Sequence, residues 1–154
     1  MEHVRTRRRA ALVGVAFAVV VATAAVASAA EGPEIAGRWL VEKRDAIILV
    51  EPRGHEIVGR IVWAKDRDGI KGDERLDMKN PKAELRSRKV LGMDILTGLP
   101  LQRQADGWYG RGRIYNPKTG KSYNVKIKLE SSNQLRLKIG GSVLGHTTRW
   151  TRAE

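Results

Sequence analysis

Apolar and polar residues alternate with a period of two along most of the chain beyond its N-terminal segment. In residues 123–129 the apolar side chains occupy every second position, and residues 135–139 repeat the pattern after the polar turn 131–133. Alternation of this kind places the apolar side chains on one face of a β-strand and the polar ones on the other. The two segments therefore predict a β-hairpin.

Turn-forming residues separate further segments of the same kind. Pro52-Arg53-Gly54 and residues 116–120 have the composition of turns, and Asn80 followed by Pro81 predicts a single helical turn ending at Leu85. The other predicted strands, which bring the total to about eight, are residues 37–43, 46–51, 56–64, 89–95, 108–115 and 146–152. This pattern predicts an all-β fold, either an up-and-down barrel or a sandwich.

The N-terminal segment has the composition of a secretory signal peptide. Four arginines precede an Ala- and Val-rich run over residues 10–26, and Ala27-Ser28-Ala29 forms a small-x-small cleavage site. We predict that residues 1–29 are removed and that residues 30–154 form one exported domain, periplasmic or secreted, with no membrane span. A retained anchor is the alternative, but the run is weakly hydrophobic and lacks a stop-transfer flank. The arginines leave both the general secretory and the twin-arginine routes open.

The net charge indicates which partners are favoured, and the cysteine content indicates which chemistry is excluded. The chain carries a formal charge of +12, of which +3 belongs to the signal segment, so the exported domain carries about +9. In an exported protein this charge favours anionic envelope components over nucleic acid. The cations alternate with apolar residues, as in 126–128 and 136–138, which is more typical of a solvated strand face than of a dedicated binding patch. The chain has no cysteine, which excludes disulfides and thiol chemistry.

Residues with catalytic or metal-binding chemistry are sparse. The acidic segment 65–82 fails the calcium-loop pattern. Counting Asp66 as position one, Gly69 falls at the fourth position instead of the sixth, and no glutamate falls at the twelfth. His55 and His146 have no paired histidine, and the glycine after Ser142 comes one residue late for a nucleophile elbow. We therefore predict a polar crossover loop, no metal, no cofactor and no enzymatic activity.

Aromatic residues are the more informative set. By alternation, Trp63 shares a face with Gly59, and Trp108 shares a face with Gly110 and Gly112. Glycine at an inward strand position either permits a bend in the wall or leaves empty volume. The second alternative opens a cavity, and an eight-stranded barrel is wide enough to hold one small ligand.

The two ends of the predicted barrel resemble the framework of lipocalin-type (calycin) proteins. Gly37-Arg38-Trp39 opens the first strand, and Arg149-Trp150-Thr151-Arg152 closes the last. In such barrels the tryptophan of the Gly-x-Trp segment plugs the closed end, and an arginine near the last strand packs over it. The resemblance implies structural roles for Gly37, Trp39, Trp150 and Arg152, with Arg149 as the alternative stacking partner.

A series of motifs in the middle of the chain is more specific. Residues 59–63, 77–81, 85–88, 91–92 and 114–123 together resemble the exported bacterial domain-of-unknown-function family 2147 (DUF2147), over essentially the whole predicted domain. The resemblance implies a small eight-stranded up-and-down lipocalin-like barrel. It also implies structural roles for Asp77 and Asn80, and the family offers no catalytic residue to carry over.

Our first hypothesis is a non-catalytic binding protein of the cell envelope that holds a small apolar or amphipathic molecule in its barrel. Arg86 and Arg88 flank the loop that would overhang the mouth, where they could pair with a ligand carboxylate or phosphate, or be no more than exposed charges. The candidate ligand-binding residues are Trp63, Arg86, Arg88, Trp108 and Tyr115. The alternative is a basic interaction module, solid inside, that docks on anionic envelope polymers or a protein partner.

Overall fold

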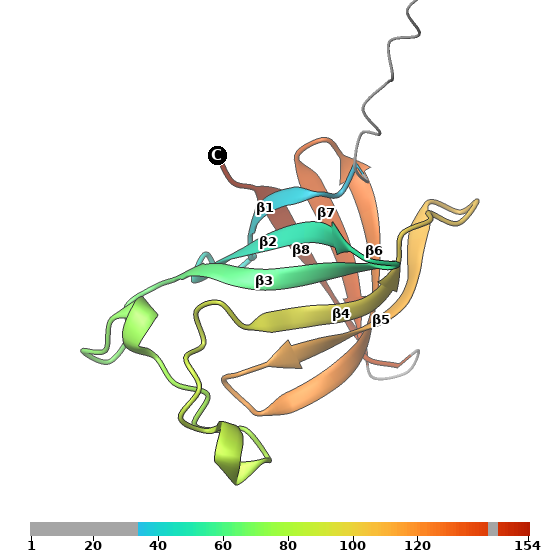
Figure 1. Ribbon diagram of the computed structural model, residues 1–154. Coiled ribbons are helices and arrows are strands. Elements are labelled where there is room, and N and C mark those ends of the chain that lie inside the picture. The colour runs from blue at the N-terminus through green and yellow to red at the C-terminus, as the bar shows by residue number, and fades with distance from the viewer. Residues whose placement is uncertain (1–33, 142–144) are drawn as a thin grey trace, which may run out of the picture.

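The structure, a computed structural model, describes residues 34–141 and 145–154, which form a closed antiparallel β-barrel of eight strands in chain order (Figure 1). The strands are β1 (Gly37–Leu40), β2 (Ala46–Arg53), β3 (Glu56–Ala64), β4 (Asp94–Pro100), β5 (Trp108–Asn116), β6 (Lys121–Ser131), β7 (Gln134–Ile139) and β8 (His146–Arg152). Pairing of β1 with β8 closes the barrel, with Trp39 opposite Arg152. The predicted up-and-down barrel is confirmed, and the predicted signal segment lies outside the described residues.

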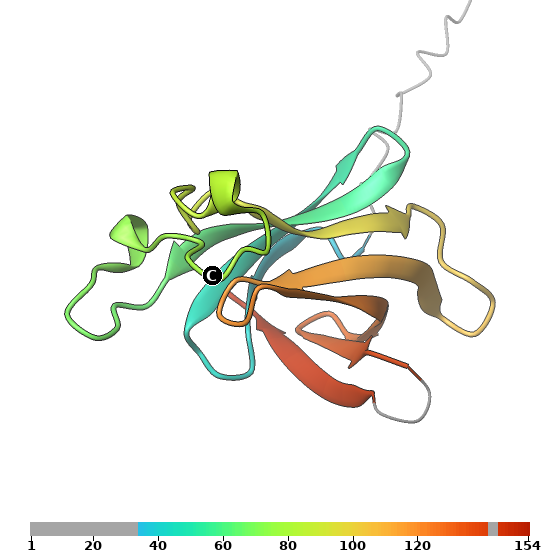
Figure 2. The same cartoon turned by 90° about the horizontal axis from the view of Figure 1, so that it is seen from below.

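Because neighbouring strands are antiparallel, their connections gather at two ends of the barrel. One end carries the turns 41–45 and 117–120 and the long segment 65–93 between β3 and β4. We name segment 65–93 the strap; it contains the short 3₁₀ helices η1 (Gly72–Glu74) and η2 (Ala83–Leu85) and projects beside the barrel (Figure 2). The other end carries the start of β1, the connection 101–107 and the end of β8.

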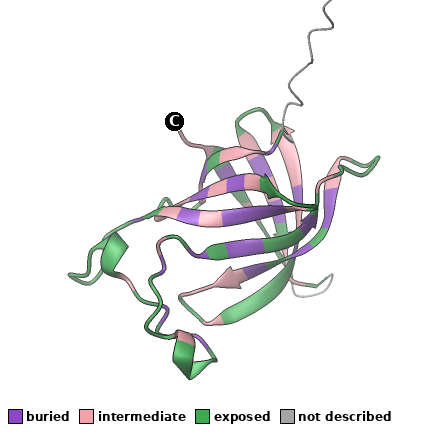
Figure 3. Ribbon diagram, in the orientation of Figure 1, coloured by how far each residue is buried: buried purple, intermediate pink, exposed green. Residues whose placement is uncertain are grey.

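A continuous apolar core lies inside the barrel, and its buried positions recur along the strands (Figure 3). At the end where β1 begins, Trp39, Ile57, Leu99 and Leu135 have no exposed surface. Burial of such side chains is the main favourable contribution to folding, because it removes apolar surface from water. We name this the closed end, and the end that carries the strap the open end.

The fourth strand differs from the prediction. The expected strand at residues 89–95 is wrong, because β4 spans Asp94–Pro100. Val90 and Met93 are buried, but they belong to the end of the strap, where the Val90 amide donates to the Arg75 carbonyl at 2.8 Å. The strand itself passes through Gly98, with φ of 69°, and ends at Pro100. Glycine and proline ordinarily interrupt a strand, so the sequence predicts a strand that ends before Gly98.

Two smaller features also test the sequence pattern. β1 ends at Leu40 instead of residue 43. The predicted single turn ending at Leu85 is present as η2, but it is a 3₁₀ turn that begins at Ala83 with Lys82 as its N-cap, so the predicted start at Asn80-Pro81 is wrong. Asn80 precedes it and accepts a hydrogen bond from the Lys82 amide through its side-chain oxygen at 2.9 Å, which satisfies a backbone donor at the start of the turn.

Candidate functional site

A cavity of about 400 Å³ occupies the open end of the barrel. Apolar side chains from the strands and the strap line its wall; they include Ile48, Ile61, Val90, Ile95, Ile114 and Trp150. Its rim is polar and comes from the turns 41–45 and 117–120, with Arg75 added from the strap. Small-molecule sites measure about 300–1,000 Å³, so this cavity is large enough for one small ligand.

Ion pairs order the rim. Asp45 accepts a hydrogen bond from Lys118 and pairs with Arg67 at 3.2 Å, which ties both turns to the strap. Burial by itself raises the pKa of the Asp45 carboxyl, but the hydrogen bond and charge of Lys118, with Arg67, outweigh burial and hold the pKa below its ordinary value. On the other side of the rim, Glu42 accepts a hydrogen bond from the Thr148 hydroxyl at 2.7 Å.

Asp77 anchors the strap to the barrel. Its fully buried carboxylate accepts hydrogen bonds from the Tyr115 hydroxyl at 2.7 Å, the Asn80 amide at 2.7 Å and the Arg88 guanidinium at 3.1 Å. A buried carboxylate is costly unless it is paired and hydrogen-bonded, and these donors meet both conditions. Burial, followed by the bond to Asp77, raises the pKa of Tyr115 to about 12. The phenol therefore remains a hydrogen-bond donor at neutral pH.

Two glycines let the strap approach the barrel closely. Gly72 lies against the carbonyl of Ala64 at the end of β3, and Gly120 lies against the carbonyl of Lys79 in the strap. A Cβ atom at either glycine would overlap that carbonyl oxygen. The strap is thus held between β3 and the turn after β5, which places Arg75 and Val90 at the cavity.

Trp63 does not line the cavity. The register of β2 with β3 places Ile48 opposite Ile61 but Ile47 opposite Trp63, so Val62 is an extra residue in β3. Such a β-bulge reverses the alternation beyond it, so Trp63 lies on the outer surface, 41% exposed. The predicted inward position of Trp63 is therefore wrong.

The predicted inward position of Trp108 is also wrong, and a β-bulge is again the reason. The register of β5 with β6 shifts between Tyr109 and Gly112, so β5 also contains a bulge. Tyr109 is consequently the buried residue, 3% exposed, while the Trp108 ring lies outside the barrel near the ammonium groups of Lys128 and Lys138.

The predicted arginines interact within the strap. Arg88 pairs with Asp77, and the Arg86 Nε donates to the Asn80 carbonyl at 2.8 Å. Neither arginine lines the cavity, whereas Tyr115 does. Of the five candidate ligand residues, the structure thus brings only Tyr115 to the cavity.

Other cavity residues escaped the sequence reasoning. Ile48, Ile61 and Ile114 occupy inward positions that alternation does predict, but no sequence signal distinguishes a core position that packs on a neighbour from one that faces space. Arg75 reaches the rim through the path of the strap, which no local pattern encodes.

The inward glycines do not create the cavity. A Cβ at Gly59 would lie 2.8 Å from the Leu96 Cβ, and one at Gly112 would lie 2.7 Å from the Leu99 Cγ. Neighbouring side chains therefore fill the volume, and glycine permits close packing of the wall. The cavity lies at the open end, between inward-facing strand residues, the turns 41–45 and 117–120 and the strap.

Trp39 plugs the closed end. Its indole N–H donates to the Ile35 carbonyl at 2.8 Å, and the Arg152 guanidinium lies 4.3 Å from the ring centroid. Arg152 also donates hydrogen bonds to the carbonyls of Glu34, Ala36 and Ser132. A Cβ at Gly37, whose φ is 134°, would overlap this guanidinium. Arg149, the alternative partner, instead pairs with Glu130 at 2.9 Å, and Trp150 is buried on the cavity wall.

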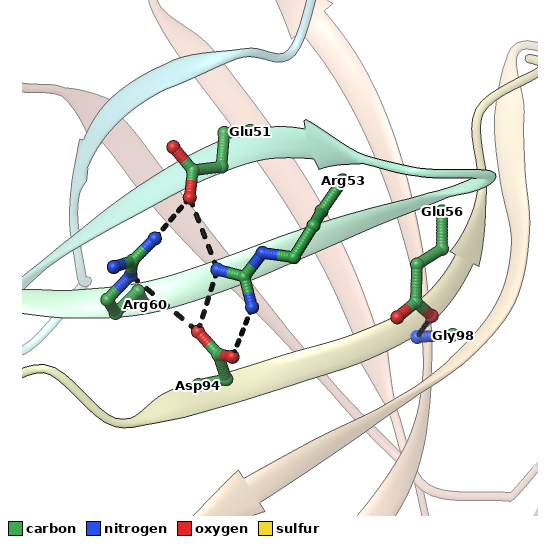
Figure 4. Close-up of polar contacts among 6 residues, drawn as sticks. All are labelled: Glu51, Arg53, Glu56, Arg60, Asp94 and Gly98. Carbon is green, nitrogen blue, oxygen red and sulfur yellow. Dashed lines mark hydrogen bonds and ion pairs between the residues drawn. The ribbon is translucent and has the colours of Figure 1, made fainter.

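The outer face of β2–β4 carries a self-contained network of ion pairs (Figure 4). Arg53 pairs with Asp94 at 2.5 Å and with Glu51 at 3.2 Å, and Arg60 pairs with the same two acids. Two cations and two acids neutralise one another, so this network joins three strands without leaving a net charge. Beside it, the Gly98 amide donates to Glu56 at 2.5 Å.

Two classes of site are absent from the part of the chain that the structure describes. In residues 34–141 and 145–154, no three His, Asp or Glu side chains are grouped closely enough to hold a metal ion. None of the helices in those residues has the length and hydropathy needed to cross a bilayer.

An eight-stranded up-and-down barrel with one plugged end and one open end is a lipocalin-like fold. The fold is similar to a solved structure described as "Protein HP1028 from the human pathogen Helicobacter pylori belongs to the lipocalin family", with a TM-score of 0.65 and 21% identity over 77% of this chain and 82% of that chain. The chain belongs to the family described as "Uncharacterized protein conserved in bacteria (DUF2147)", whose model matches residues 37–152. No curated protein sequence matches the chain.

Proposed function

We propose that this chain is an exported cell-envelope protein that binds a small apolar or amphipathic molecule, without catalysis, in the open end of its barrel. The observation that carries the proposal is the cavity of about 400 Å³ with an apolar wall and a polar rim. The lipocalin-like fold supports the proposal, because the interior of an eight-stranded barrel holds one small ligand when side chains leave space.

The lining favours a ligand with an apolar body and a polar head. Isoleucine side chains and Trp150 offer no hydrogen bonds to the inner part of a ligand, apart from the indole N–H. At the rim, Lys43 and Arg75 are cations that a carboxylate or phosphate head could reach. Asp45 does not oppose such a head strongly, because Lys118 and Arg67 already neutralise it.

The test begins with native mass spectrometry of protein purified from its own host, where we expect a co-purifying small molecule. A titration of ligand-free protein with sodium dodecanoate then locates the site through tryptophan fluorescence. Trp150→Phe should remove the fluorescence change, because Trp150 lines the cavity, whereas Trp108→Phe should preserve it, because that ring lies outside the barrel. The proposal fails if the responses of these two variants are reversed, or if neither a native ligand nor dodecanoate binds.

A rim variant tests the polarity of the ligand. Arg75→Gln should weaken dodecanoate binding and leave binding of the uncharged dodecanol unchanged, because only the carboxylate interacts with the guanidinium. Equal losses for both compounds would instead indicate that Arg75 shapes the cavity without recognising charge.

Export is a separate part of the proposal, since residues 1–29 lie outside the described residues. We expect the mature protein to begin at Ala30, or one residue later, and to occur in the envelope or the medium. Intact-mass measurement of each cell fraction checks this. A protein found only as a full-length species that begins near Met1 and stays in the cytoplasmic fraction would overturn the export assignment and leave the cavity proposal intact.

A further inference from the structure

The outer face of β5, β6 and β7 is strongly basic. Its outward positions include Arg111 and Arg113 on β5, Lys126 and Lys128 on β6, and Lys138 on β7. We name these residues the basic face. The strand register sets Lys126 directly opposite Lys138 and Lys128 opposite Trp108, so the charges lie side by side across three strands.

The Trp108 ring lies close to the ammonium groups of two of these lysines. The Lys138 ammonium lies 5.1 Å from the centroid of the indole ring, and the Lys128 ammonium lies 6.0 Å from it. The negative potential above the ring attracts both cations. Lys128 also donates to the backbone carbonyl of Asp106 at 2.9 Å, which limits its movement. The indole therefore holds two ammonium groups on one face of the barrel.

The charges of the basic face are not neutralised by acids within the described part of the chain. Its five cations form no ion pair there, whereas Glu130 pairs with both Arg136 and Arg149 nearby, and the network of Figure 4 is balanced. Like charges directly opposite each other on neighbouring strands destabilise a sheet. The Lys126 and Lys138 pair thus has an energetic cost that packing of the barrel does not require.

A polar groove of about 610 Å³ continues from the basic face toward the open end. Its lining combines Arg111, Lys126 and Lys138 with hydrogen-bonding groups of Asn124, His146 and Thr147. Pockets for small apolar ligands are lined mainly by apolar side chains. Because this groove is lined by cations and hydrogen-bonding groups instead, it suits a charged and hydroxylated molecule. The groove lies beside the apolar cavity, and Ile139 and His146 border both.

We propose that the basic face and this groove bind an anionic polysaccharide. The observations argue against two other polyanionic surfaces. A single-stranded nucleic acid binds through exposed aromatic platforms, and Trp108 is half-buried and occupied by two ammonium groups. A bilayer surface is commonly bound by protruding apolar side chains beside the cations. Among the described residues, the exposed large apolar side chains lie on β3, on the strap and, for Tyr123, at the cavity, and none lies on the outer face of β5–β7. Carboxylate or phosphate groups spaced along a hydroxylated chain match both the cations and the polar groove.

The test uses the exported domain, residues 30–154, with oligogalacturonate as the probe and neutral dextran as the control. We expect oligogalacturonate to bind at low ionic strength, dextran not to bind, and the affinity to fall steeply with salt. The double variant Lys126→Gln with Lys138→Gln should bind severalfold more weakly. The slope of log affinity against log salt should decrease by about two, one for each lysine removed.

A matched variant distinguishes this face from overall charge. Lys71→Gln with Lys82→Gln removes the same net charge from exposed positions on the strap and should leave binding unchanged. The Lys126 and Lys138 variant should also melt no lower than the wild type, because a like-charged pair is relieved. Equal losses in the two double variants, no binding of oligogalacturonate, or tighter binding of single-stranded DNA or anionic vesicles with the same dependence on Lys126 and Lys138 would each overturn the proposal.

Discussion

Trp39 is fully buried at the closed end, and both its indole N–H and the face of its ring have partners. Removing a buried tryptophan costs about 3–5 kcal/mol, through lost transfer free energy and the cavity that remains. A domain of this size is stable by only about 5–15 kcal/mol. We therefore expect Trp39→Ala to lower the melting temperature severely, as measured by circular dichroism.

Trp63→Ala is the matched control. The Trp63 side chain is 41% exposed on the outer surface, so its removal should cost about 1 kcal/mol, near the average for a point mutation. Since Trp63 lies outside the cavity, its removal should also leave ligand binding unchanged. If the two variants melted alike, and only Trp39→Ala lost binding, the open and closed ends would have been assigned in reverse.

Tyr115 makes stability depend on alkaline pH. Its pKa rises from the ordinary value near 10 to about 12 in the folded state, so the folded protein binds the phenol proton more tightly than the unfolded chain. The resulting stabilisation is fully present below about pH 10 and is lost as the pH rises toward about 12. The difference in melting temperature between the wild type and Tyr115→Phe should shrink over this range. A difference that stays constant from pH 9 to beyond 11 contradicts the hydrogen bond to Asp77.

Residue positions were predictable from the sequence only as far as strict alternation holds. Alternation correctly places Ile48, Ile61 and Ile114 inside, but it fails at Trp63 and Trp108, because each lies beside a β-bulge. A bulge adds one residue to one strand, and its position depends on the partner strand, which a single segment does not reveal. Both tryptophans therefore lie on the outer surface of the barrel, although strict alternation places them inside.

At the level of elements, the strap is held against the barrel by specific contacts, among them those of Asp77 and Gly120. Gly120 has φ of 70° and lies against the Lys79 carbonyl, so Gly120→Ala introduces both backbone strain and a collision with the strap. Gly54→Ala provides the control, because Gly54 has φ of 61° and open space around it. The strain alone costs about 1–2 kcal/mol. We expect a larger loss of stability for Gly120→Ala, together with faster tryptic cleavage within residues 65–93.

The comparison of Gly120→Ala with Gly54→Ala separates the cost of displacing the strap from the cost of backbone strain in the turn. Equal melting temperatures and equal cleavage patterns in the two alanine variants would show that Lys79 moves away without cost. In that case the strap would not fix the position of Arg75 at the rim.

The strands themselves were largely predictable, whereas the strap and β4 were not. Hairpin turns such as residues 131–133 connect neighbouring strands, so local sequence specifies them. The strap instead depends on contacts between distant residues, such as Asp77 with Tyr115 and Gly120 with Lys79. Glycine at residue 98 and proline at residue 100 concealed the true extent of β4, because their strand positions depend on the pairing with β3.

At the scale of the whole molecule, the two ends of the barrel differ: one end is tightly packed, and the other contains a cavity. The closed end is packed and sealed by Trp39 and Arg152, while the open end keeps an apolar cavity beneath a rim that ion pairs hold in place. The unneutralised cations lie on a third region, the outer face of β5–β7. The proposed cavity site and the proposed outer-face site share only Ile139 and His146 among their lining residues, so substitutions at Trp150 and Arg75 test the first and substitutions at Lys126 and Lys138 test the second.

This division predicts different costs for the same truncation at the two ends. Ile57 is fully buried at the closed end, so Ile57→Ala should cost about 2–5 kcal/mol, including the term for a new internal cavity. Ile114 lines the existing cavity, and Ile114→Ala enlarges a space that already exists, so its cost should lie near or below about 2 kcal/mol. Chemical denaturation of both variants, without ligand, measures the two free energies of unfolding. Equal losses would mean that the mouth is as tightly packed in solution as the closed end, and the space assigned to a ligand would not exist.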